Sequence, residues 1–187
     1  MGGTVFLDIE TRELVPENRD LSLMRISIAG VRKDGEAFIF TEEDIAGLFT
    51  ILDDADLIVG HNLILFDYKV LNRYAGYNVA AKHKERTLDF FYAIMQMTDR
   101  RVSMNDLAQR NLGIAKLGEG KDAPVMYKEG RMDELRAYLE QDLLILERLY
   151  DHLLQHGRLK YGHIVYKEPV EREIELPIKA RPKNPSP

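Results

Sequence analysis

Five residues in this sequence have the types and the spacing that metal-dependent hydrolysis requires. Asp8 and Glu10 lie two positions apart in a run of β-forming residues, so their side chains point to the same face of a strand. Asp67 lies near the start of a helical stretch, and Tyr138 and Asp142 are four positions apart on one face of a long helix. Because acids are depleted in strands and costly to bury, the strand pair indicates a cation site.

Each of these residues also has an ordinary interpretation. Two acids in a strand can face solvent at a sheet edge, a single helical Asp is most often a solvated or capping residue, and a Tyr and an Asp can share a helix surface. Only the combination of these residues favours a catalytic site over the ordinary interpretations. Four carboxylates can hold two divalent ions about 4 Å apart, which suits phosphodiester hydrolysis because hard oxygen ligands leave positions open for water and phosphate. The candidate ligands are Asp8, Glu10, Asp67 and Asp142.

Strands and helices that could position these acids alternate along the chain. β-rich segments of alternating or continuous apolar character predict five strands, at 4–10, 23–31, 36–40, 56–62 and 86–90, with the second and third joined by a KDG turn. Apolar residues at helical spacing predict helices at 42–54 after a Thr41 cap, at 65–75, at 103–113 after a Ser103 cap, and at 131–156.

This order of elements predicts one α/β domain of three layers. Three strands in antiparallel order come first, and strands alternating with helices follow, so we expect a mixed five-stranded sheet with three antiparallel and two parallel strands, flanked by helices. The domain is expected to cover residues 1–165 of the 187. Residues 166–187, rich in proline, are expected to form an extended, partly disordered tail or an added strand.

Composition narrows the function classes. The chain has no cysteine, which excludes disulfides and thiolate metal sites. A net charge of −5 argues against electrostatic binding of long duplex DNA, but an enzyme that holds cations with acids is expected to be acidic. No segment has the roughly 18 uncharged apolar residues of a membrane span, so we expect a cytoplasmic protein with no membrane partner.

Three segments resemble the motifs of a known enzyme group. FLDIET (6–11), GHNLILFD (60–67) and YLEQD (138–142) look like the three motifs of the DEDD exonuclease superfamily, in order and with the acids in register. The intervening sequence is most similar to prokaryotic RNase H-like exonucleases related to the proofreading domains of family B DNA polymerases. The resemblance implies an RNase H-like fold, two Mg²⁺ or Mn²⁺ ions, and 3′–5′ hydrolysis that releases nucleoside monophosphates.

The resemblance also implies a role for each matching residue. The four acids would be metal ligands, and Tyr138 would orient the attacking water, as in the tyrosine subgroup. The histidine subgroup places His five residues before the last Asp, where this chain has Ala137. Polar positions beside the substrate path in the family match residues that we expect to contact nucleic acid. These are Thr11 and Asn62, and His61 could line the same pocket and contact nucleic acid there.

The substrate is less closely defined, because the group includes DNA proofreaders, RNA-trimming enzymes and repair nucleases. Single-stranded DNA is the favoured substrate, and an exoribonuclease or a non-catalytic binding module is the alternative. Lys116 and Lys121, in a glycine-rich turn, could contact substrate phosphates. Asp89 could support the four metal-binding acids without binding the metal itself, although a turn residue at the end of a strand is the commoner interpretation.

Overall fold

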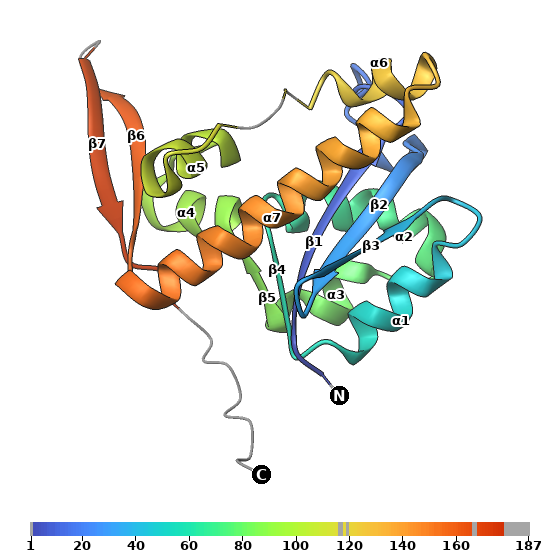
Figure 1. Ribbon diagram of the computed structural model, residues 1–187, viewed down its shortest axis with the longest axis horizontal. Coiled ribbons are helices and arrows are strands. Elements are labelled where there is room, and N and C mark those ends of the chain that lie inside the picture. Colours follow the sequence, from blue (N-terminus) through green and yellow to red (C-terminus); the bar gives the residue numbers. More distant parts are fainter. Residues whose placement is uncertain (1, 116–117, 119, 166–167, 178–187) are drawn as a thin grey trace.

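One mixed sheet organises the chain. The computed structural model describes residues 2–115, 118, 120–165 and 168–177, and Figure 1 shows the arrangement of their helices and strands. The strand order is β3-β2-β1-β4-β5, with β1 antiparallel to β2, β2 antiparallel to β3, and β4 parallel to both β1 and β5. The strands are β1 (Thr4–Thr11), β2 (Ile26–Lys33), β3 (Glu36–Phe40), β4 (Leu57–Gly60) and β5 (Thr87–Asp89). The expected five-stranded mixed sheet is confirmed.

Helices cover both faces of this sheet. The long helix α7 (Met132–His156) crosses one face, and α1 (Ala46–Asp54), α2 (Tyr68–Ala75) and α3 (Val79–His83) lie on the other (Figure 1). Alternation along β1 divides the core accordingly: Phe6 joins the cluster under α7, and Val5 and Leu7 join the cluster under α1 and α2. The remaining elements are α4 (Phe90–Thr98), α5 (Met104–Leu112), α6 (Ala123–Lys128), the 3₁₀ turns η1 (Leu21–Leu23) and η3 (Lys84–Arg86), and the π-helical turn η2 (Leu63–Asp67).

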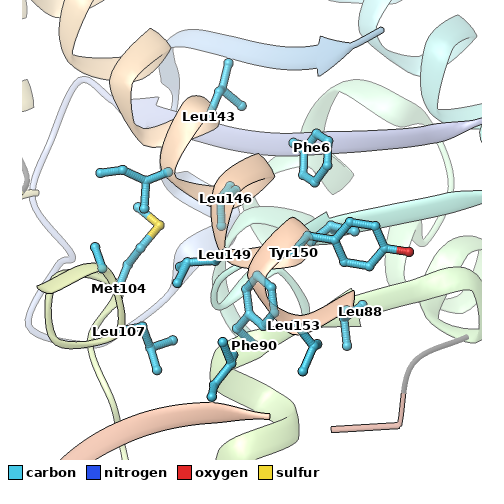
Figure 2. Close-up of a cluster of buried hydrophobic side chains, with 14 of the residues drawn as sticks. Phe6, Leu88, Phe90, Met104, Leu107, Leu143, Leu146, Leu149, Tyr150 and Leu153 are labelled. Carbon is cyan, nitrogen blue, oxygen red and sulfur yellow. The ribbon is translucent and has the colours of Figure 1, made fainter. Parts of the chain in front are cut away.

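The cluster under α7 contains most of the large apolar side chains of that helix. Leu143, Leu146, Leu149 and Leu153 point from α7 towards residues of the sheet and of α4 and α5 (Figure 2). Tyr150 contacts Phe6 of β1 edge to face, with ring centroids 5.9 Å apart. This regular apolar face fixes the rotation of α7 about its axis, so the positions of its polar residues follow from its packing.

Two helix predictions need correction at their first residues. The helix expected at 42–54 begins at Ala46, because the side chain of Asp44 accepts hydrogen bonds from the amide and hydroxyl of Thr41 and closes a separate turn. Thr41 therefore does not cap the helix. The helix expected at 65–75 is divided, with the π-helical turn η2 preceding α2. The Ser103 cap is confirmed, since its hydroxyl accepts from the amide of Asp106.

A hairpin follows α7. Strands β6 (Leu159–Val165) and β7 (Glu168–Ile174) pair in antiparallel register, and they extend to one side of the molecule beside α5 (Figure 1). Asn111 of α5 exchanges two hydrogen bonds, of 2.7 and 2.8 Å, with the backbone of Lys160. Part of the expected tail is thus a strand, the domain boundary at 165 stays a prediction, and residues 178–187 lie outside the described part of the chain.

No helix in the described part of the chain combines the length and the apolar character needed to cross a membrane.

Candidate active site

The central strand β1 presents two acids on the face that α7 covers. Asp8 and Glu10 alternate with core residues and lie on the same side as Phe6, as their spacing predicts. In the neighbouring strand, Gly30 is the partner of Asp8. A β-carbon at position 30 would lie 2.8 Å from Leu143 and 3.0 Å from Leu139, so this glycine lets α7 approach the sheet closely beside Asp8.

Helix α7 brings the third acid to this strand. Asp142 is 1% exposed, and its neighbours Leu139 and Leu143 pack into the core. Asp8, Glu10 and Asp142 each offer one carboxylate oxygen, and these three oxygens lie within 4.8 Å of one another. No other set of three potential ligand residues meets this criterion among the residues that the structure describes.

Tyr138 lies on α7 one turn before Asp142 and is 1% exposed. The backbone at Gly118 passes close to its ring, because a β-carbon there would lie 3.4 Å from Tyr138 Cε2. The Tyr138 ring therefore lies between the core face of α7 and the backbone at Gly118. Both Tyr138 and Asp142 line the groove described below.

The fourth acid comes from the turn after β4. Asp67 is the last residue of η2 and is 3% exposed. Its Oδ1 is buried and has no hydrogen-bond partner among the described residues. Burial raises the pKa of Asp67 well above its usual value, and the charges of Asp8 and Asp89 raise it further. Asp67 is not part of the group of three within 4.8 Å, but it lines the same groove.

These acids fit a site for divalent cations. A buried carboxylate charge without a protein partner, beside three converging carboxylates, is unfavourable unless a proton or a cation neutralises it. Hard ions such as Mg²⁺ and Mn²⁺ prefer oxygen ligands of this kind. The donor set thus suits the expected metal, and Asp8, Glu10, Asp67 and Asp142 are the residues that could hold it.

A groove of about 980 Å³ contains the site. The five residues assigned to catalysis and the three expected beside the substrate path, Thr11, His61 and Asn62, all line it. Thr11 donates from its hydroxyl to the carbonyl of Glu13 at 2.8 Å. His61 Nε2 lies 2.8 Å from the carbonyl of Val102, and Asn62 adopts a left-handed backbone conformation with φ of 71°.

A family model described as the RNase_H superfamily matches residues 5–154, which include nearly all of β1, the turn after β4 and most of α7. The chain belongs to the RNase_H superfamily. No curated protein matches its sequence significantly. The matched residues contain all four candidate metal ligands and Tyr138.

Two solved structures resemble this RNase_H superfamily member. The family B DNA polymerase of the hyperthermophilic archaeon Pyrobaculum calidifontis has a TM-score of 0.63 and 17% identity over 82% of this chain. This chain spans 25% of the polymerase chain. The EXO domain of Aedes aegypti Nibbler has a TM-score of 0.60 and 13% identity, and the match covers 82% of this chain and 78% of that one. At these identities the likeness shows a shared fold.

Several groove residues of this RNase_H superfamily member were not assigned to the site from sequence. Leu14 and Val15 are 61% and 50% exposed, and they line the groove together with Phe66 and Phe91. Leu14 and Val15 are exposed, and exposed apolar residues follow no periodic pattern, so the sequence could not assign these two residues to the site. Arg101 also lines the groove, although its sequence context fits an ordinary solvated loop equally well.

Of the two lysines proposed to contact phosphates, Lys121 lines the groove and Lys116 lies outside the described residues. Asp89 does end strand β5, as the commoner interpretation has it, but it is only 3% exposed. Burial raises the pKa of Asp89 above its usual value.

Proposed function

We propose that this chain is a divalent-metal-dependent 3′–5′ exonuclease of the tyrosine subgroup, which shortens single-stranded DNA and releases nucleoside 5′-monophosphates. The observation that carries the proposal is the convergence of Asp8, Glu10 and Asp142 within 4.8 Å in an open groove, next to the buried Asp67. Membership of the RNase_H superfamily supports it.

The acids would hold two Mg²⁺ or Mn²⁺ ions, with Asp8, Glu10, Asp67 and Asp142 as ligands. Such a pair of ions, when bound, supplies an activated water at neutral pH and stabilises the charge of the phosphoryl transition state. The burial of Asp67 and Asp142 keeps competing water away from their carboxylates. It also strengthens their attraction for a cation.

Tyr138 would orient the attacking water. Its ring is buried on α7, one turn before Asp142 and close to the backbone at Gly118. Hydrolysis forms a bond from the water oxygen to phosphorus and breaks the bond from phosphorus to the 3′ oxygen. The shortened strand keeps a 3′ hydroxyl group, and the terminal nucleotide leaves with the phosphate.

The walls of the groove favour an unpaired strand. Leu14, Val15, Phe66 and Phe91 offer apolar and aromatic surface on which bases can stack once they have left a duplex. Arg101 and Lys121 line the same groove and could neutralise phosphates. Thr11, His61 and Asn62 lie beside the acids, where they could contact the terminal nucleotide.

A labelled-oligonucleotide assay tests the proposal. Purified protein with Mn²⁺ or Mg²⁺ should shorten a 5′-labelled single strand one nucleotide at a time, and a 3′-labelled strand should lose its label as a mononucleotide. Asp142→Asn should abolish this activity. Asp151→Asn, which changes an exposed acid on the same helix, is the matched control and should leave activity unchanged.

Matched DNA and RNA strands separate the proposed function from its alternatives. Faster trimming of RNA than of DNA would identify an exoribonuclease. Calorimetry that detects nucleic-acid binding but no divalent-ion binding would instead identify a non-catalytic binding module. Activity retained in Asp142→Asn would contradict the assigned site.

A further inference from the structure

The turn that carries Asp67 is held by a neighbouring acid. Asp89 ends β5 and pairs in register with Gly60, the last residue of β4. Asp89 Oδ1 accepts a hydrogen bond of 2.7 Å from the amide of Asn62, and its Oδ2 accepts one of 2.9 Å from the amide of Ile64. Both oxygens of this buried carboxylate therefore bind the segment between β4 and Asp67.

These amides need a partner outside their own turn. The first N–H groups of a helical segment have no acceptor within the segment. In η2 the first backbone bond runs from the amide of Phe66 to the carbonyl of Asn62, at 3.0 Å, so the amide of Ile64 depends on Asp89. Asn62 also has a left-handed conformation, which is uncommon for residues other than glycine.

The turn is also tight. A β-carbon at Gly60 would lie 2.5 Å from Leu63 Cγ, so the chain folds back directly onto the end of β4. The amide of Tyr68 bonds to the carbonyl of Leu63, which closes the π-helical turn at the residue after Asp67. The position of the Asp67 carboxylate is thus set by the start of this turn, where Asp89 binds.

We propose that Asp89 is a positioning residue, which fixes η2 through the amides of Asn62 and Ile64 and so places Asp67 for metal binding. Asp89 does not line the groove. Its oxygens are directed to backbone amides, because Oδ1 also accepts from the amide of Tyr92 at 3.0 Å and caps α4. This inference rests on the proposed function, since it assigns a role towards the proposed metal site.

Two substitutions separate the capping role from the positioning role. In Asp89→Ser the hydroxyl can still cap α4 through the amide of Tyr92, because serine is a favoured capping residue, but one short side chain cannot also satisfy Asn62 and Ile64. In Asp89→Asn the Oδ1 acceptor can stay, whereas the amide NH₂ would face the N–H of Ile64. Asn78→Ala, which removes an exposed cap of α3, is the control for loss of a cap.

The test uses the full chain and two measurements. Amide hydrogen exchange in the metal-free protein should quicken at Asn62 and Ile64 by about tenfold or more in Asp89→Ser, and chiefly at Ile64 in Asp89→Asn. Calorimetric titration with Mn²⁺ should show affinity about 10- to 100-fold weaker in Asp89→Ser, the range found for residues that orient metal ligands. Asn78→Ala should match the parent in both measurements.

Unchanged exchange at both amides, or Mn²⁺ affinity within twofold of the parent in both Asp89 variants, would overturn the inference. An equal loss of affinity in Asn78→Ala would also overturn it, because general destabilisation would then explain the effect. If Asp89→Ser does not fold, the exchange rate at Ile64 and the Mn²⁺ affinity of Asp89→Asn decide whether the inference holds. A parent protein that binds no Mn²⁺ would instead overturn the proposed function.

Discussion

At the scale of single residues, Asp67 shows most directly how the demands of folding and of metal binding oppose each other. Its carboxylate is 3% exposed, lies near the charges of Asp8 and Asp89, and has one oxygen without a hydrogen-bond partner among the described residues. Such an environment destabilises the metal-free protein, because a buried charge costs more than the same charge in water. The same environment increases the affinity for a cation.

Replacing Asp67 by Asn should therefore stabilise the metal-free protein while it weakens metal binding. We expect Asp67→Asn to raise the free energy of unfolding by about 1 kcal/mol, or about 2–4 °C in the melting midpoint at this chain length. Addition of Mn²⁺ should raise the midpoint of the parent by more than that of the variant. Thermal melts with and without Mn²⁺ measure both effects, and a variant less stable than the metal-free parent would contradict this account.

Tyr138 should act on the reaction and not on metal binding. Tyr138→Phe keeps the buried ring but removes the hydroxyl, so we expect kcat to fall by about 100-fold, the scale of a positioned proton-handling group. Mn²⁺ affinity should stay within about twofold. Single-turnover assays and calorimetry measure the two quantities. A kcat that does not change would show that the hydroxyl has no part in the reaction.

At the scale of elements, the distance between α7 and β1 decides whether the acids form one site. Gly30 allows that approach, because its missing side chain leaves room for Leu139 and Leu143 beside Asp8. The leucine side chains also hold α7 in its rotation about the helix axis (Figure 2). The geometry of the candidate metal site thus depends on a residue that carries no functional group.

A larger side chain at position 30 should move α7 away from the sheet. We expect Gly30→Val to destabilise the protein by about 1–3 kcal/mol, the usual cost of overpacking, and to weaken Mn²⁺ affinity by separating Asp142 from Asp8. Urea denaturation and calorimetry provide the two measurements. In the control Gly3→Val, the new β-carbon would meet only Lys33 Cε at 3.9 Å, so both quantities should stay close to the parent. Equal effects in the two variants would contradict this role of Gly30.

Local periodicity explains which elements and site residues could be predicted from sequence. A strand places Asp8 and Glu10 on one face, and a helix places Tyr138 near Asp142, whatever the rest of the chain does. The sequence offers Asp89 as an acid near the four candidate ligands, but its contacts could not be predicted, because Asn62 and Ile64 are more than 20 positions away and become neighbours only when β4 and β5 pair.

At the scale of the whole molecule, two cores on opposite faces of the sheet support the groove. The core away from α7 includes His83, a fully buried histidine of α3 that binds neighbouring segments. Arg86 donates to its Nδ1 at 2.9 Å, and its Nε2 lies 3.4 Å from Asp53 of α1. Burial, together with the charges of Arg86 and Lys82, lowers the pKa of His83 to about 4, although Asp53 acts in the opposite direction.

This histidine should make the stability of the protein depend on pH. Between an unfolded-state pKa near 6.5 and a folded-state pKa of about 4, the unfolded chain binds more protons than the native protein, so stability falls as pH falls through this window. Melting midpoints from pH 7 to pH 4 should decrease less steeply in His83→Gln than in the parent. His156→Gln, which removes an exposed histidine of α7, should follow the parent, and identical slopes in all three proteins would exclude His83 as the cause.

The central claim is that four acids from β1, η2 and α7 form one centre for two metal ions. Anomalous diffraction from crystals of the full chain soaked in Mn²⁺ tests it most directly. We predict two anomalous peaks about 4 Å apart in the groove, bound by the carboxylates of Asp8, Glu10, Asp67 and Asp142. Soaked crystals with no peak in the groove, or with Mn²⁺ bound only elsewhere, would contradict the claim.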